Sequence, residues 1–209
     1  QAGLSNQKDS AVAIGNQAGY CNQNISATAV GVQAGYWNQA VNTTALGDIA
    51  GYCNQGSEAT AVGIAAGYVT QGTKAVAIGY QAGQGNTGET GDFGDGSISI
   101  GLFAGAIRQD DSGIAIGAGA GGGYYPTLLI RGATGLTGGD GATGRQGDSA
   151  VAIGPLAGSF AQGASAIAIG LNAGVGFDYD DDSGIFTTGG QGQSSIAIGD
   201  NAGYLGQGQ

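Results

Sequence analysis

The side chains of this sequence that could bind a ligand fall into two groups, and the first is a line of aromatic residues. Tyrosine recurs every sixteen residues at Tyr20, Tyr36, Tyr52 and Tyr68, and Trp37 follows the second of them. A regular line of rings can stack on itself and add stability, or it can offer a stripe for a ligand. We favour the interpretation as a structural stack. If the line instead binds a ligand, the four tyrosines and Trp37 are the candidate ligand-binding residues.

The second group is a run of acidic residues near the C-terminal end. Asp178, Asp180 and Asp182 alternate like the first ligands of a calcium-binding loop. The pattern then fails, because Ser183 stands where a glycine should turn the chain and no glutamate closes the loop. Two interpretations stay open, a calcium site and a solvated acidic loop. Calcium is the one cofactor that the sequence suggests.

The composition excludes several other kinds of chemistry. The chain has 209 residues and no histidine, so the commonest general base and zinc ligand is missing. Its net charge of -10 argues against nucleic acid or an anionic membrane as a partner. No apolar run approaches the ~18–20 residues of a membrane helix.

A polysaccharide-active enzyme needs paired carboxylates in a cleft, but the acidic residues here lie in glycine-rich loops, so we do not expect an enzyme. The hypothesis of an ice-binding solenoid has even less support, because we do not expect threonine to form an outward ladder.

The residues around these candidates belong to a repeat of sixteen residues. The segment SAVAIGNQAG, residues 10–19, returns along the whole chain. Its step from an aliphatic residue to glycine falls at Ile14, Val30, Leu46, Val62, Ile78, Ile100, Ile116, Ile153, Ile169 and Ile198. Self-similarity at a short fixed period is typical of a stacked architecture in which each unit contacts its neighbours.

Each repeat, counted from Ser10 as its first position, contains two short strands and two turns. Positions three and five are aliphatic or threonine, whereas position four is alanine in nine of ten copies, with Ser99 the exception. Alternation along a strand places these two sets on opposite faces. We expect the Val and Ile face to fill the interior of the coil. The alanine face should then point outward and pack against another copy.

The pattern predicts an all-β fold, a parallel β-solenoid (β-roll) of about ten sixteen-residue rungs. Stacked at the ~4.8 Å spacing of strands, ten rungs make a rod of roughly 50 Å. Gln23, Gln39, Gln55 and Gln71 should form a ladder. Cys21 and Cys53 lie in one column two rungs apart, a separation of ~9.6 Å that is too long for a disulfide within one chain.

Three insertions lengthen the second half of a rung, after Gly83, Gly121 and Gly174. All should emerge from one edge, where binding loops are usually found. The longest contains six Gly-X-Y triplets from Gly132 to Ser149, the pattern of a collagen triple helix. A glycine-rich side loop is the alternative. We therefore divide the chain into a first β-roll segment (1–121), a collagen-like insertion (122–148) and a second β-roll segment (149–209), with one continuous rod as the alternative.

The SAVAIG, KAVAIG and SAIAIG segments resemble the head repeats of YadA-like trimeric autotransporter adhesins. The AIG-x-x-AGY-x-x-Q arrangement is similar to repeats in phage tail-fibre and giant-virus surface proteins. The resemblance covers the rungs and not the insertions. It implies a left-handed roll, three chains around a common axis, and an adhesive or fibre-forming role. The sixteen-residue rung departs from the adhesin repeat, which is nearer fourteen.

The functional expectation is a structural and adhesive protein: a rigid rod, extracellular or on a cell or virion surface, that presents loops for attachment. Its expected partners are copies of itself, with a trimer favoured, and a glycan or a cell-surface receptor. A filament that assembles end to end is the alternative.

Overall fold

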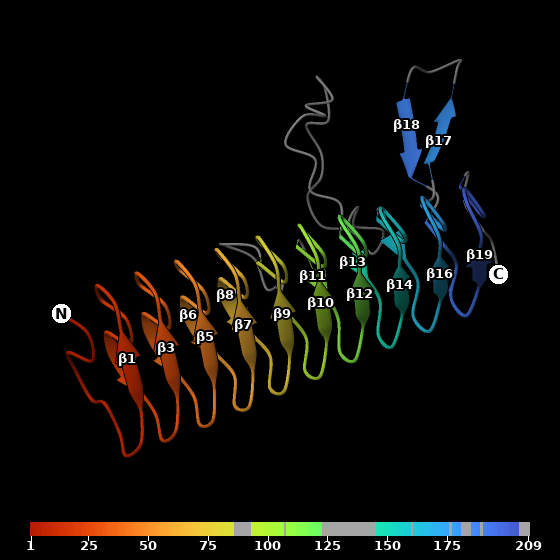
Figure 1. Ribbon diagram of the computed structural model, residues 1–209. Coiled ribbons are helices and arrows are strands. Elements are labelled where there is room, and N and C mark those ends of the chain that lie inside the picture. The colour runs from red at the N-terminus through yellow and green to blue at the C-terminus, as the bar shows by residue number, and fades with distance from the viewer. Residues whose placement is uncertain are drawn as a thin grey trace.

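The computed structural model describes residues 1–85, 93–106, 108–122, 145–159, 161–175, 177–180, 185–188 and 190–204. Its regular elements are strands, and no helix occurs among these residues. The strands stack in parallel, one above the next, along a rod (Figure 1). The prediction of an all-β parallel β-solenoid is confirmed. The predicted left-handedness of the coil stays a prediction.

One ten-stranded parallel sheet runs along the rod. Its strands, in spatial order, are β1 (Val12–Ile14), β3 (Thr28–Val30), β5 (Thr44–Leu46), β7 (Thr60–Val62), β9 (Val76–Ile78), β10 (Ile98–Ile100), β12 (Ile114–Ile116), β14 (Val151–Ile153), β16 (Ile167–Ile169) and β19 (Ile196–Ile198). Equivalent residues pair, so that Ala13 lies beside Ala29. The strands β12 and β14 pair directly, and the sheet therefore continues from the first β-roll segment into the second.

The second strand of each rung forms a line of shorter sheets. Four of these strands make one parallel sheet, β2 (Cys21–Gln23), β4 (Trp37–Gln39), β6 (Cys53–Gln55) and β8 (Val69–Gln71). Three more make another, β11 (Arg108–Gln109), β13 (Arg145–Gln146) and β15 (Ala161–Gln162). Phe93 bridges to Gln71 on one side and to Gln109 on the other, and so links the two sheets.

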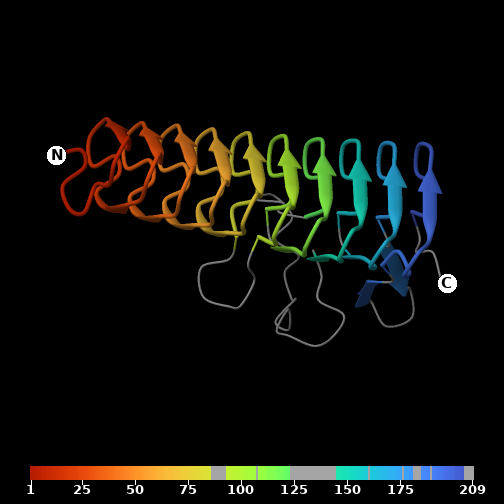
Figure 2. The ribbon, with the colours of Figure 1, turned by 90° about the horizontal axis from the view of Figure 1, so that it is seen from below.

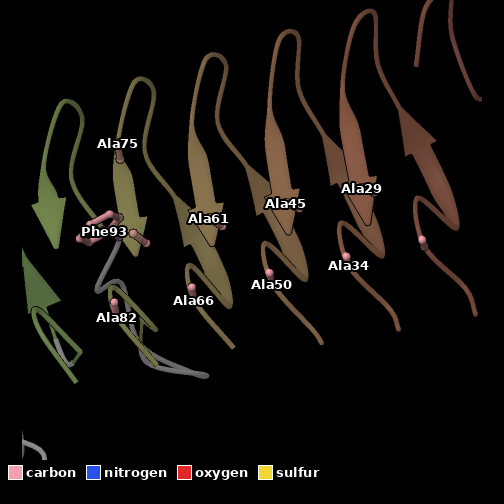
Figure 3. Close-up of a cluster of buried hydrophobic side chains, with 11 residues drawn as sticks. Ala29, Ala34, Ala45, Ala50, Ala61, Ala66, Ala75, Ala82 and Phe93 are labelled. Atoms are coloured by element: carbon pink, nitrogen blue, oxygen red, sulfur yellow. The ribbon is translucent and has the colours of Figure 1, made fainter. Parts of the chain in front are cut away.

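The interior of the coil is filled by alanine, and this corrects the sequence prediction of its two faces. The alanines at position four, such as Ala29 and Ala45, are fully buried. They pack against the alanines at position nine, such as Ala34 and Ala50, in every rung of the cluster (Figure 3). The Val and Ile side chains point outward instead. A rung of sixteen residues is too thin to hold a β-branched side chain from each strand between its two walls.

A column of buried glutamines completes the interior. Gln55 Nε2 donates to the carbonyl oxygen of Thr44 at 2.9 Å and to that of Ala59 at 3.2 Å, which ties the two halves of a rung together. Successive amides also bond to one another, Gln39 to Gln55 at 3.1 Å and Gln55 to Gln71 at 3.3 Å. The predicted glutamine ladder is confirmed for these residues. In the fifth rung Phe93 takes the place of glutamine and is 1% exposed.

The turns use left-handed backbone at fixed positions. Glycine at position six, as in Gly31, has φ near +137°, and a side chain there would collide with the backbone of Gly47 in the next rung. Asparagine fills several of the other left-handed positions, since it tolerates positive φ better than most residues, and serine and glutamine recur at further ones. Repetition of this turn chemistry explains why every rung has the same cross-section.

The insertions enter at equivalent places in the second half of their rungs. After them the chain returns to the same column of pairs, Gln71 with Phe93, Gln109 with Gln146, and Gln162 with Gln191. The prediction of a common edge agrees with these pairings. Within the third insertion β17 (Phe177–Asp180) and β18 (Ile185–Thr188) form an antiparallel pair that projects from the rungs (Figures 1 and 2). Most of the Gly-X-Y segment lies outside the described residues.

Candidate functional site

The predicted tyrosine column forms a continuous stack. The ring centroids lie 4.9 Å apart for Tyr20 and Tyr36, and 5.0 Å apart both for Tyr36 and Tyr52 and for Tyr52 and Tyr68. The planes are nearly parallel, at 3–17°. The facing sides of neighbouring rings are therefore turned toward one another, and a ligand approaching from the side meets the ring edges and the hydroxyl groups. The stacking interpretation is confirmed, and ligand binding stays a prediction.

Burial in this stack alters the acidity of one phenol. The pKa of Tyr52 is raised above 10.0, chiefly because burial disfavours the charged form, and additionally because phenolate charge on Tyr68 or Tyr36 would repel its own. The hydroxyl group of Tyr52 therefore stays protonated at neutral pH and can both donate and accept a hydrogen bond.

The side chain of Trp37, in β4, projects from the four-stranded sheet beside the tyrosines. It is 42% exposed, and in its column it pairs with Cys21 on one side and Cys53 on the other, which have much smaller side chains. Its ring is 6.3 Å from that of Tyr36 and tilted by 30°. Both cysteines are free thiols, as the column spacing predicted, and burial raises the pKa of Cys53. Trp37 is thus more exposed than the tyrosines beside it, which are half-buried.

An asparagine ladder runs next to the aromatic residues, and the sequence prediction did not include it. The side-chain amides of Asn6, Asn22, Asn38 and Asn54 donate from each to the next over 2.8–3.0 Å. These asparagines occupy left-handed backbone, where asparagine is favoured. Their recurrence every sixteen residues was the available signal. We name the aromatic and asparagine columns together the tyrosine–asparagine strip; it consists of Tyr20, Tyr36, Tyr52, Tyr68, Trp37, Asn22, Asn38 and Asn54.

The opposite wall of the rod carries an apolar surface. We call it the aliphatic stripe, and it comprises the outward side chains Val12, Ile14, Val30, Leu46, Val62, Val76, Ile78, Ile98, Ile100, Ile114, Ile116, Val151, Ile153, Ile167, Ile169, Ile196 and Ile198. Even in the middle of the sheet Ile116 and Ile153 are 36% and 37% exposed. Thr28, Thr44 and Thr60 pair in register on the outward face and interrupt the stripe, so threonine does form a short outward ladder, contrary to the sequence expectation. The repeat pattern identifies these residues as one face of the strand, but they lie on the outside of the coil and not in its interior as predicted.

The acidic residues do not form a defined cation site in the part of the chain that is described. Asp178 and Asp180 lie in β17, and Asp182 lies outside the described residues, so the calcium hypothesis stays a prediction. Asp95 and Asp111 occupy neighbouring rungs, but their carboxylates accept backbone hydrogen bonds from Thr73 and Asp95. No group of three or more potential ligand side chains gathers among the described residues.

Comparison with known proteins adds no identification, because no family model, no curated protein and no solved structure matches this sequence. Within the described ranges there is also no helix that is long and apolar enough to cross a membrane. The class that the structure itself defines is a β-solenoid repeat protein with two unlike long faces, one aliphatic and one lined by tyrosine and asparagine.

Proposed function

We propose that this chain is a rigid segment of an extracellular or virion-surface fibre. Copies of the chain associate through the aliphatic stripe, and the opposite side of the rod presents the tyrosine–asparagine strip and the inserted segments for attachment. The role is structural and adhesive, and the function requires no catalysis. The observation that carries this proposal is the outward column at position five of the repeat, which holds Val, Ile or Leu in every strand of the ten-stranded sheet.

The size of the stripe supports association. Ten rungs that each expose a large aliphatic side chain, most with a second one beside it, present on the order of 1,000 Å² of apolar surface, whereas the largest patch on a typical monomer is ~300–600 Å². Burial of this surface stabilises an assembly by ~25 cal/mol for each Å² removed from water. The stripe is also straight, because equivalent residues pair in register along the whole sheet. Two such stripes match over their full length.

A homotrimer is the assembly that we favour. Each chain has one narrow aliphatic stripe along its ten-stranded sheet, which suits a position facing a shared axis. The association that the sequence suggested is thus retained, but the face that mediates it changes from the alanines to the valines and isoleucines. In this arrangement the second sheets and the insertions remain on the outside.

The test is the mass of the native particle in solution, measured by native mass spectrometry and sedimentation. The protein should have the mass of three chains. Exchange of Ile100 and Ile116 together for glutamate places two charges in the stripe and should give single chains. The matched control is Ile25→Glu, an equally apolar residue that is 48% exposed away from the ten-stranded sheet, and it should leave the mass unchanged. A single-chain mass for the unaltered protein at millimolar concentration would exclude the proposal.

A filament is the second candidate, because the rung-to-rung pairing that runs through the sheet can also join one copy to the next. Electron microscopy separates the two candidates. Discrete rods of uniform length indicate a fibre segment, and long threads with a repeat of one rod indicate end-to-end assembly.

A further inference from the structure

We propose that the tyrosine–asparagine strip binds an extended, neutral, β-1,4-linked polysaccharide that lies parallel to the rod with one sugar on each rung. This inference rests on the proposed function for the outward position of the strip, and it adds the class of ligand.

The spacing of the strip from one rung to the next is the first observation that supports a β-1,4-linked ligand. The tyrosine rings repeat every 4.9–5.0 Å, and the asparagine amides follow the same rung-by-rung repeat through hydrogen bonds of 2.8–3.0 Å. A β-1,4-linked chain of sugars is straight and advances by a similar length with each sugar. An α-1,4-linked chain coils and loses this match within a few sugars. A straight periodic surface therefore selects for the β linkage.

The polar groups of the strip suit sugar hydroxyls. In the described structure the hydroxyl groups of Tyr36 and Tyr52 have no hydrogen-bond partner. Asn22 and Asn38 each use one amide N–H toward the next asparagine and keep the other free. The rungs of Tyr36 and Tyr20 thus offer a phenol and an amide that donates, and the rung of Tyr52 offers a phenol beside the amide of Asn54. Sugars present both kinds of partner at every unit.

Trp37 supplies the apolar contact. A sugar ring has an apolar face of C–H groups, and tryptophan is an indole platform with a large apolar area. Because Cys21 and Cys53 flank Trp37 in its column, its 42% exposed ring rises above the sheet where one sugar of the chain would lie. The tyrosine rings stack with their faces turned toward one another, so Trp37 should contribute most to affinity.

The fold itself does not require these columns. In later rungs of the same solenoid the position of the tyrosines is held by Ala106, Gly122, Ser159 and Val175, all of them buried. The strip is confined to the first four rungs counted from Ser10, and a tyrosine returns at this position only in the last described rung, at Tyr204. The side chains of the strip are uncharged, and the protein as a whole has a net charge of -10. Both facts favour an uncharged polysaccharide over an anionic one.

The experiment is isothermal titration of the intact protein with cello-, manno- and chito-oligosaccharides of increasing length, and with amylose fragments of the same lengths. Affinity for at least one β-1,4-linked series should rise with length until the chain spans the strip, and the amylose series should give no heat. Trp37→Ala should weaken binding about tenfold or more, as loss of a central aromatic anchor does. The control Tyr80→Ala removes a ring that is 45% exposed and contacts Phe103 outside the strip, and it should bind as the unaltered protein does.

Each other outcome overturns the inference. Absence of heat with all three β-1,4-linked series, equal binding by Trp37→Ala, or equal binding of amylose would exclude it. A change of native mass in Trp37→Ala would show that the strip is an interface between copies. The double variant Ile100→Glu and Ile116→Glu separates this inference from the proposed function, because single chains of that variant should still bind the oligosaccharide. If the unaltered protein proves not to be a trimer, the titration with oligosaccharides still tests this inference.

Discussion

Ser99 Oγ donates a hydrogen bond to Gln109 Oε1 inside the coil, with 2.5 Å between the two oxygens. In other rungs an alanine faces the glutamine, and the side-chain oxygens of Gln23, Gln39, Gln146, Gln162 and Gln191 are buried without a partner. Ser99 is the exception to alanine at position four, and it supplies the donor that these rungs lack.

Replacement of Ser99 by alanine should therefore destabilise the protein. The change leaves Gln109 Oε1 buried without its partner and should lower the free energy of unfolding by about 1 kcal/mol. Urea unfolding followed by circular dichroism measures this. The matched control is Ser159→Ala, because Ser159 Oγ is buried and has no partner, so its removal should cost nothing or stabilise slightly. Equal losses in the two variants would contradict the assignment.

The glycine at position six should be essential inside the stack and less so at its last described rung. Gly117 has φ +127°, and a Cβ added there would lie 2.7 Å from the carbonyl group of Gly154 in the next rung. Gly199 has φ +123° but meets no atom closer than Ala202 Cβ at 4.0 Å. Gly199→Ala should cost about 1–3 kcal/mol from backbone strain alone. Gly117→Ala should cost distinctly more, because the backbone of β14 must also move.

Amide hydrogen exchange shows which strands the Gly117→Ala substitution destabilises. The amide protons of β12 and β14 should exchange faster in Gly117→Ala and keep their rates in Gly199→Ala. Unchanged protection of β14 in Gly117→Ala would show that contact between these glycines does not hold the rungs at their observed spacing.

Ile49 is a local defect that a single substitution should repair. Its φ is +49°, a left-handed conformation that a β-branched residue adopts less readily than other residues do. Gln17, Gln33 and Gln81 hold the equivalent position, and Gln33 Nε2 donates to Gln17 Oε1 at 3.0 Å. Ile49→Gln should raise the midpoint of thermal unfolding by relieving strain and extending this pair. Ile25→Gln, at an exposed isoleucine that is not among the positive-φ residues, should not.

The stability of the stack should fall at alkaline pH because of Tyr52. Its pKa in the folded state is raised above 10.0, so the folded protein holds this proton more tightly than the unfolded chain does. The stabilisation is present in full below pH 10 and is lost as the pH rises from there through the folded pKa. Denaturant unfolding across this range should show a steeper loss for the unaltered protein than for Tyr52→Phe. Parallel curves would indicate that Tyr52 titrates as an exposed tyrosine does.

The period of the repeat was sufficient to predict the rungs, their parallel register and the columns of identical residues. It was not sufficient to decide which face of the strand lies inside. Alternation distinguishes Ala29 from Val30 but is symmetric between the two faces, and the usual preference for burying the larger aliphatic residue gave the wrong answer. The deciding quantity is the thickness of the rung, since Ala29, Ala34 and the amide of Gln39 already fill it.

The candidate site was predicted in part for a similar reason. The spacing of Tyr36 and Tyr52 fixed their stacking, because stacked rungs place equivalent residues in contact. The asparagine ladder was missed because Asn38 and Asn54 lie in a strand, where the pattern gave no reason to expect left-handed backbone. The structure shows that this backbone turns their amides toward one another.

The continuity of the ten-stranded sheet past every insertion separates two kinds of genetic change. Duplication or loss of sixteen codons would alter the reach of the rod in steps of one strand spacing, about 4.8 Å, and leave its cross-section as it was. Changes within the inserted segments would alter what the rod displays without touching its length. Natural variants of this chain should therefore differ in rung number and in inserted segments independently.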